Sequence, residues 1–213
     1  MTPIISERPR VAGDREQEIL DATLQVLAES GYDRLTMDAV AAAARASKAT
    51  LYRRWSNKLS LVIDALQHSK GLHEVPDTGS LREDLRATFC GTGGLTDPTT
   101  VAVFASVLTA IARDAEFAEA FRRDVVGPKI AASRVVWERA RLRGELRDDV
   151  DLDLVEPALA GIVLHRLFVM GEVPDPDSIT NVIDQIILPA ATRGPASPTD
   201  SHPESREEDG SHD

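Results

Sequence analysis

Apolar side chains recur about every three to four residues along most of the chain, which is the spacing of an amphipathic α-helix. The first stripe runs from Ile19 to Leu27 and is followed by Gly31, a residue that commonly ends a helix. Further stripes predict helices at residues 36–43, 47–54, 57–66 and beyond, 81–90, 99–112, 115–126, 128–143, 152–170 and 177–188. Pro128 is expected in the first turn of its helix, where a backbone N–H is not needed. No segment shows the alternating pattern of a strand, so the sequence predicts an all-α protein.

Two of the expected helices are short and lie close together. They cover residues 36–43 and 47–54 and are separated by a turn of about three residues, which is the arrangement of a helix-turn-helix. Thr36 and Ser47 are suited to cap the two helices, because their hydroxyls can accept hydrogen bonds from the first helical turn. Small or apolar residues occupy the positions where the helices would pack together: Val40, Ala41, Ala44, Ala46 and Leu51.

Charge is distributed unevenly along the chain. The 213 residues include 24 Lys and Arg against 35 Asp and Glu, for a formal net charge of −11. Residues 1–72 have a balance of +1, residues 73–193 of −7 and residues 194–213 of −5. The total argues against a protein that coats nucleic acid or an anionic membrane by bulk attraction. No acid lies between Ala39 and Ile63, however, and that window contains five basic residues: Arg45, Lys48, Arg53, Arg54 and Lys58.

The remaining composition narrows the class of protein. The single cysteine, Cys90, cannot form an internal disulfide, and no apolar stretch has the length of a membrane span or the character of a secretory signal. We therefore expect a cytoplasmic protein without a membrane partner. No metal-ligand spacing and no nucleophile–base pair is visible, so we predict no catalytic residue, metal or cofactor. Residues 1–12 are predicted to form a flexible arm, and the acidic, Pro- and Ser-rich residues 194–213 a disordered tail.

A helix-turn-helix places its second helix in the major groove of DNA, with the N-terminal residues nearest the base edges. There Lys48 can donate to guanine, Ala49 can contact a thymine methyl group, and Tyr52 can point the same way. Other polar groups can bind phosphates and so position the protein: the hydroxyls of Thr36, Thr50 and Tyr52 and the ammonium of Lys58. The alternative is a solvated helix face in which Tyr52 and Trp55 simply close a core. The caps, the tight turn, the small packing residues and the acid-free window together favour DNA binding.

The stretch from Val40 to Lys58 resembles the signature of the TetR (tetracycline-repressor-like) family of transcriptional regulators. The resemblance rests on the spacing Ser-x-x-Thr-Leu-Tyr-x-x-aromatic-x-x-Lys and on the preceding helix, and it covers about residues 14–66. It implies DNA contacts at Thr36, Ser47, Lys48, Ala49, Thr50, Tyr52, Arg54 and Lys58, to which we add the basic Arg53. The family usually has Gly in the turn where this chain has Arg45. A left-handed Arg45 would cost about 1 kcal/mol, which its side chain could offset by reaching a phosphate.

The same resemblance implies two domains, a DNA-binding domain over residues 13–58 and a helical regulatory and dimerisation domain over residues 59–193. Residues 140–172 resemble one broad subgroup of the family, in which the last two long helices pair with their copies in a dimer. The expected interface residues are apolar: Leu159, Ile162, Leu167, Phe168, Ile179, Val182, Ile183 and Ile186. On periodicity alone, an internal core fits these residues nearly as well.

The family also implies a ligand pocket in the C-terminal half. The candidate residues are Phe89, Phe104, Phe117, Phe121, Arg134, Trp137 and His165. Each such residue more often belongs to an ordinary core than to a ligand pocket, and Arg134 is expected to pair with one of the many nearby acids. The leading hypothesis is a repressor that binds a palindromic operator in double-stranded DNA as a homodimer and is released by a small-molecule effector. The alternative is an all-α enzyme or small-molecule-binding protein with an incidental basic segment.

Overall fold

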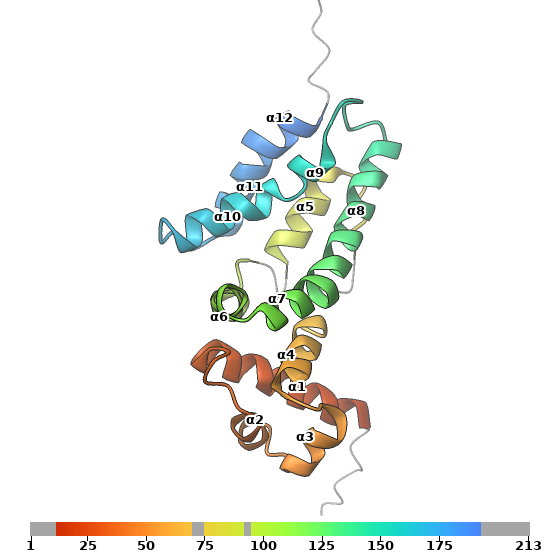
Figure 1. The fold of residues 1–213 in the computed structure, drawn as a ribbon. Coiled ribbons are helices and arrows are strands. Elements are labelled where there is room, and N and C mark those ends of the chain that lie inside the picture. The colour runs from red at the N-terminus through yellow and green to blue at the C-terminus, as the bar shows by residue number, and fades with distance from the viewer. Residues whose placement is uncertain (1–11, 70–74, 92–94, 193–213) are drawn as a thin grey trace, which may run out of the picture.

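The computed structural model describes residues 12–69, 75–91 and 95–192, and the regular elements within these ranges are helical (Figure 1). The all-α prediction is therefore confirmed. The expected tail at residues 194–213 lies outside the described residues, as does the expected arm except for Ala12, which already belongs to the first helix. Among the described helices, none has the length and apolar character needed to cross a membrane.

Four helices make up the N-terminal part of the molecule: α1 (Ala12–Ser30), α2 (Met37–Ala43), α3 (Lys48–Arg54) and α4 (Lys58–Gln67). The side chains of Thr36, Ser47 and Asn57 cap α2, α3 and α4, each by accepting a hydrogen bond from the backbone N–H three residues later. Gly31 follows α1 with a φ of +77°, a left-handed conformation that suits glycine. The predicted helix-turn-helix is thus confirmed at the level of its caps and its turn.

The rest of the chain folds into a second group of helices above the first (Figure 1). In chain order they are α5 (Leu81–Cys90), α6 (Pro98–Arg113), α7 (Ala115–Phe121), the π-turn η1 (Arg122–Val126), α8 (Gly127–Leu142), α9 (Leu152–Val155), α10 (Ala158–Phe168), α11 (Pro176–Val182), the π-turn η2 (Ile183–Ile187) and α12 (Leu188–Ala191). The expected single helix at 152–170 is wrong. It is divided at Pro157, which has no N–H with which to continue the α9 ladder.

Pro128 does not begin a separate helix, contrary to the sequence-based expectation. Val126 and Gly127 keep helical backbone angles, and α7 continues through η1 into α8. A proline ring inside an α-helix clashes with the carbonyl four residues earlier, here that of Asp124, and widening the helix into a π-turn relieves the clash. The same arrangement recurs where η2 precedes Pro189. Two prolines in helical segments therefore produced π-turns instead of helix ends.

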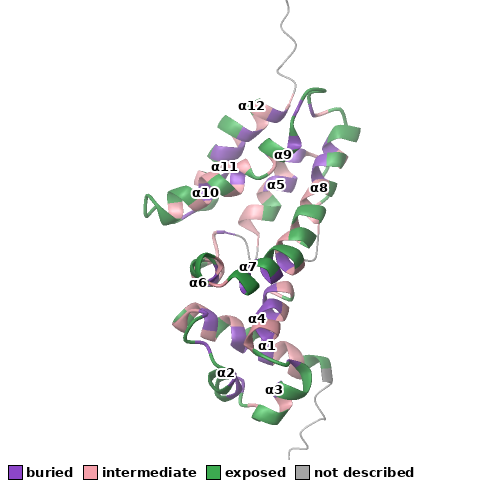
Figure 2. Cartoon of the chain, viewed as in Figure 1, coloured by how far each residue is buried: buried purple, intermediate pink, exposed green. Residues whose placement is uncertain are grey.

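Two apolar clusters hold the fold together. The first combines α1–α4 with residues of α6, α7 and η1, and it includes the fully buried Leu27, Leu61 and Phe117. The second combines α5 and α8–α12 around the fully buried Trp137 and Ile183. Figure 2 shows the buried residues along the inner faces of both helix groups. Because α4, α6 and α7 pack with the N-terminal helices, the first core crosses the domain boundary expected after residue 58.

Candidate DNA-binding interface

Helix α3, the expected recognition helix, packs one face into the core and exposes the other. Leu51 and Trp55 on the anchored side are 0% and 4% exposed, and they pack in the first core with Val40 of α2. Lys48, Ala49 and Arg53 are exposed, and the Tyr52 side chain is 54% exposed. Tyr52 of α3 and Trp55, the C-cap residue that follows it, therefore have different environments, because Trp55 closes the core while Tyr52 faces solvent.

The turn between α2 and α3 contains Arg45 where the family usually has Gly, and it adopts the left-handed conformation considered for that position. Arg45 has a φ of +50°, so a non-glycine residue occupies the left-handed region. The Nη2 atom of Arg15, on α1, donates to the Arg45 carbonyl oxygen at 2.7 Å. The bond ends on the backbone, and the Arg45 side chain is exposed. Arg15 was not among the sequence candidates, since the two residues lie 30 positions apart.

The predicted hydroxyl contacts lie at helix starts, where they already serve as caps. Thr36 Oγ1 accepts from the Ala39 N–H at 3.1 Å, and Ser47 Oγ accepts from the Thr50 N–H at 3.1 Å. Ser47 Oγ also shares a hydrogen bond with Thr50 Oγ1 at 2.8 Å. Thr36 and Ser47 are exposed and Thr50 is half-buried, so the three hydroxyls lie at the surface next to the starts of α2 and α3.

Two bases of the acid-free window have acidic partners from outside it. Lys48 Nζ donates to Asp38 Oδ2 at 2.6 Å, and Arg54 Nη2 donates to Glu16 Oε1 at 3.1 Å. These hydrogen bonds raise the pKa of both basic groups, and the attraction of the two carboxylates adds to the effect. Neither acid was a sequence candidate. Asp38 is the last acid before the window, but only the fold shows that it reaches Lys48.

Lys58 is directed toward the protein in this structure. Its Nζ donates to the Tyr32 carbonyl at 3.1 Å and lies 4.3 Å from the centre of the Tyr32 ring, and the side chain is half-buried. Trp55 Nε1 donates to Asp64 of α4 at 2.7 Å, which fixes the end of α3 against α4. The phosphate contact expected for Lys58 stays a prediction.

Comparison with known proteins agrees with this geometry. A family model described as bacterial regulatory proteins of the tetR family matches residues 19–65, and one described as a tetracyclin repressor-like C-terminal domain matches residues 75–186. The chain belongs to the TetR family of transcriptional regulators. The resemblance noted in the sequence is thereby confirmed, and the chain is a DNA-binding regulator of the helix-turn-helix type and not an enzyme.

Curated relatives of this TetR-family chain cover most of its length. An uncharacterised HTH-type transcriptional regulator of Mycobacterium tuberculosis is 37% identical over 185 residues, which are 84% of this chain and 89% of the relative. A protein of Mycobacteroides abscessus described as the DNA-binding transcriptional repressor TetR is 37% identical over 82% of this chain and 92% of its own length. The crystal structure of a TetR family transcription regulator, SCO0332, is 29% identical, with a TM-score of 0.65 over 82% of this chain and 97% of that one.

The residues expected to line a ligand pocket are divided between the two cores. Phe117 and Phe121 belong to the first core, where Phe117 also contacts Tyr32 with ring centres 4.5 Å apart. Phe89, Phe104 and Trp137 belong to the second core or pack against it. Arg134 pairs with Asp153 and Glu156, as expected, and His165 is exposed. The seven residues are therefore divided between two cores and the surface, and a ligand pocket lined by them stays a prediction.

The expected dimer residues divide by helix face. Leu159, Ile179, Val182 and Ile183 are buried in the core of this protomer, so packing within one chain already accounts for them. Ile162 and Leu167 are half-buried, and Phe168 and Ile186 are 39% and 46% exposed. Three further apolar residues, in the segment that follows α10, are exposed: Val169, Met170 and Val173.

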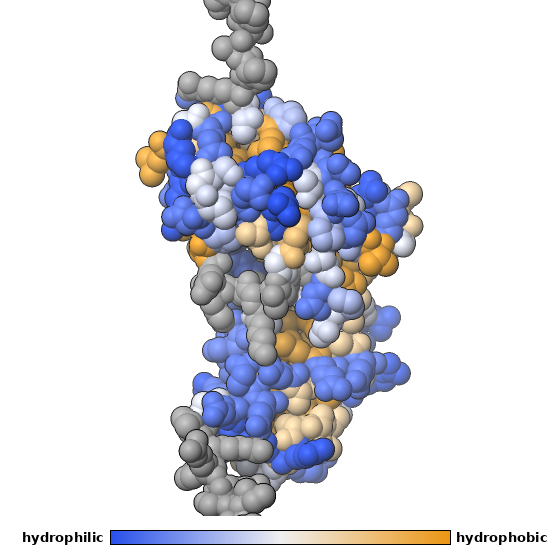
Figure 3. All heavy atoms as spheres, turned by 180° about the vertical axis from the view of Figure 1, so that it is seen from behind, coloured by the Kyte–Doolittle hydropathy of each residue, from blue (hydrophilic) through white to orange (hydrophobic). Residues whose placement is uncertain are grey.

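The apolar end of α10 projects from one side of the molecule (Figures 1 and 2). The space-filling view from behind shows hydrophobic surface on the corresponding edge (Figure 3). Periodicity identifies the apolar stripes of these helices without saying which one faces inward, so a role in a dimer stays a prediction for the exposed members of the set.

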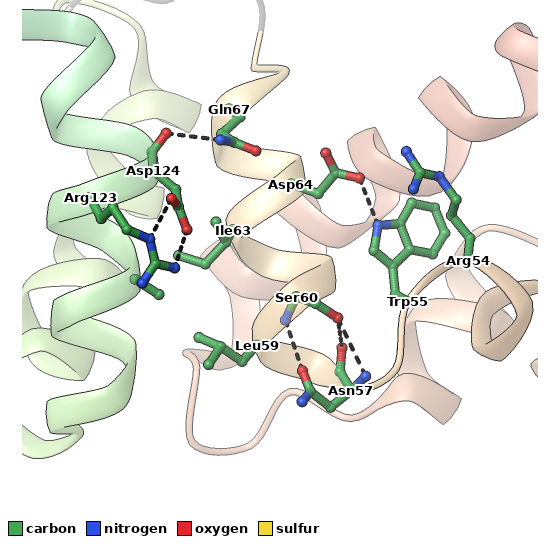
Figure 4. Close-up of a pocket in the computed structure, with 11 residues that line it drawn as sticks. Arg54, Trp55, Asn57, Leu59, Ser60, Ile63, Asp64, Gln67, Arg123 and Asp124 are labelled. Atoms are coloured by element: carbon green, nitrogen blue, oxygen red, sulfur yellow. Dashed lines mark hydrogen bonds and ion pairs between the residues drawn. The ribbon is translucent and has the colours of Figure 1, made fainter.

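Helix α4 connects the DNA-binding helices to the upper group. It runs between the α7–η1–α8 segment and Trp55, and a cavity of about 400 Å³ lies beside it (Figure 4). The Gln67 side chain of α4 donates its Nε2 hydrogen to the Asp124 carbonyl at 2.9 Å. Pro128 has no N–H to donate to that carbonyl, so the π-turn presents an acceptor to α4. The proline that the sequence placed at a helix start thus provides a contact between the two helix groups.

Proposed function

We propose that this TetR-family chain is a repressor that recognises an inverted-repeat operator through the exposed start of α3. The observation that supports this most directly is the contrast between the buried face and the exposed face of α3. Leu51 and Trp55 hold the helix in the core, while Lys48, Ala49 and Tyr52 are exposed at its N-terminal end. Because base edges are read by the N-terminal residues of a recognition helix, these three side chains are the candidates for base contact. The predicted phosphate contacts at Thr36, Arg45, Ser47 and Thr50 lie around them.

We propose that the operator is bound by a homodimer. The exposed apolar residues at the end of α10 and at Ile186 supply a surface for the second copy, and a two-fold axis there would present two recognition helices. Half-sites would then be about 34–36 Å apart along the DNA, or a multiple of that distance. We also retain a DNA-binding unit over residues 13–58 and a regulatory unit over residues 59–193 as a functional division.

A small-molecule effector is proposed to bind within the second core. Among the residues that the structure describes, two buried donors on α8 and α5, Trp137 Nε1 and Arg86 Nε, have no hydrogen-bond partner. Trp137 is 1% exposed and lies on α8, while Arg86 lies on α5, which packs against α8. Buried donors without partners are costly, so an acceptor supplied by a ligand or a water would lower the free energy of this region.

Helix α4 is the element through which such an effector would act. It carries Lys58 next to the DNA-binding helices and Gln67 next to η1. An effector that prefers a different position of α4 would change the separation of the recognition helices and weaken operator binding. The size of the change is limited by the preference of the effector for that state. A regulator acting on chromosomal DNA in this way works in the cytoplasm.

The proposal is tested by selecting duplexes from a randomised pool with the purified full-length protein. We expect an inverted repeat to be enriched, and we expect Lys48→Ala to reduce affinity for that duplex by about tenfold or more, the loss of one good base contact. Tyr52→Phe tests the phenolic hydroxyl alone. Enrichment of no motif would overturn the repressor proposal and favour the alternative of a helical binding protein with an incidental basic segment.

A further inference from the structure

One acidic side chain lies directly beside the expected base-reading residue. Asp38 is in the first turn of α2, and its Oδ2 accepts from Nζ of Lys48, the first residue of α3, at 2.6 Å. The two side chains are 60% and 63% exposed, so the pair lies on the surface and not inside the packing of α2 against α3. Asp38 is also the last acid before the basic window of Ala39 to Ile63.

The chemistry of the pair favours base edges over phosphates. A lysine ammonium has three N–H donors, so Lys48 can keep one bond to Asp38 and still donate to O6 or N7 of guanine. The Asp38 carboxylate can in addition accept from N4 of cytosine. A phosphate bound by Lys48 would instead lie next to the carboxylate, where two negative groups repel each other. The pair is therefore better suited to a G·C base pair than to the DNA backbone.

We propose that Asp38 is a specificity-determining residue of the DNA interface, which directs Lys48 to base edges and opposes its binding to phosphates. This inference rests on the proposed function, because it requires that Lys48 faces DNA. It goes further in assigning a role to an acid that the family signature does not include. The exposed carboxylate lowers affinity for unrelated DNA and so increases the difference between operator and non-operator sequences.

A merely structural role for Asp38 predicts different results. An exposed ion pair changes the folding equilibrium by at most about fivefold, and the position of Asp38 in the first turn of α2 gives its carboxylate a favourable helix-dipole interaction. Loss of those effects would weaken binding to all duplexes together. Loss of a specificity role instead strengthens binding to unrelated DNA and relaxes the choice of base at one position of each half-site.

The test uses Asp38→Asn in the full-length protein, with Glu16→Gln as the matched control, because Glu16 pairs with Arg54 in the same way. Affinity is measured for the duplex selected by the wild type and for a shuffled duplex of equal length, over a range of salt concentrations. We expect D38N to bind the shuffled duplex several-fold more tightly, with a salt dependence steeper by about one phosphate contact. A second selection with D38N should show a relaxed base preference at one position of each half-site. E16Q should keep the wild-type preference at that position.

The inference is overturned if D38N selects the wild-type motif unchanged and keeps the wild-type ratio of operator to shuffled affinity. It is also overturned if both affinities fall together, as a structural role requires. Asp38→Ala provides a second variant, and the thermal melting of both variants shows that they fold. If the wild type itself selects no motif, the proposed function fails, which distinguishes that failure from the failure of a role for Asp38.

Discussion

The left-handed turn at Arg45 makes a quantitative prediction about stability. A residue with a Cβ atom costs about 1–2 kcal/mol in this conformation, and glycine avoids that cost. Glycine also gives the unfolded chain more conformational freedom, which removes about 0.4–1 kcal/mol of the gain. The Arg15 hydrogen bond ends on the carbonyl of residue 45 and is kept by any side chain there. We therefore expect Arg45→Gly to be more stable than Arg45→Ala by about 0.5–1 kcal/mol.

The assay is thermal or urea unfolding of the two variants, followed by circular dichroism. For a protein of this size, the expected difference corresponds to about 1–4 °C in melting temperature. Ala49→Gly is the control, because Ala49 is an exposed residue inside α3, where glycine should destabilise by up to about 1 kcal/mol. The comparison of Gly with Ala must therefore change sign between the two positions. Equal or lower stability of Arg45→Gly relative to Arg45→Ala would refute a strained turn.

Three further predictions follow from the contacts between helix groups and from the exposed surface. Gln67→Ala removes the hydrogen bond to the Asp124 carbonyl and should lower the unfolding free energy by about 0.5–1.5 kcal/mol, whereas Gln17→Ala, on the surface of α1, should change it by less than about 0.5 kcal/mol. Phe168→Glu should shift sedimentation toward a monomer without loss of helix content, and an unchanged sedimentation coefficient would exclude this surface from the dimer. Burial and, to a lesser extent, nearby acids raise the pKa of Tyr32 to about 12, so the folded state retains the phenolic proton that the unfolded chain loses near pH ~10. The contribution of this proton to the unfolding free energy should be fully present below pH ~10 and be lost as the pH rises toward 12. Tyr32→Phe should lack this decline.

The local features of the fold were predictable because short-range chemistry determines them. Thr36, Ser47 and Asn57 mark helix starts by their capping side chains, and Gly31 marks a helix end by its left-handed backbone. Proline was misread, because its effect depends on tertiary context. Pro157 interrupts a helix, whereas Pro128 is accommodated by a π-turn in which the Asp124 carbonyl accepts from Gln67. That donor lies 57 residues away from Asp124, beyond the reach of a local pattern.

The sequence predicted the individual residues of the candidate site but not the ion pairs that they form with acids elsewhere in the chain. The family signature located α3 and its exposed face, since the spacing of Leu51 and Trp55 requires one buried side. The absence of acids between Ala39 and Ile63 suggested more unpaired positive charge than the structure has. Asp38 pairs with Lys48, and Glu16 pairs with Arg54, from outside that window. Which apolar stripe of α10 and η2 faces inward was likewise decided by packing, so half of the expected dimer residues proved to be core.

Reading of DNA bases by the exposed start of α3 can be measured by fluorescence anisotropy with the selected duplex and a shuffled duplex. Wild type, Lys48→Ala and a remote control, Arg141→Ala on α8, would be compared at matched salt concentrations. We expect Lys48→Ala to lose most of its affinity for the selected duplex and to change little in its affinity for the shuffled duplex, and we expect Arg141→Ala to resemble the wild type. Equal affinity of the wild type for both duplexes, or an equal loss on both in Lys48→Ala, would contradict base reading by α3.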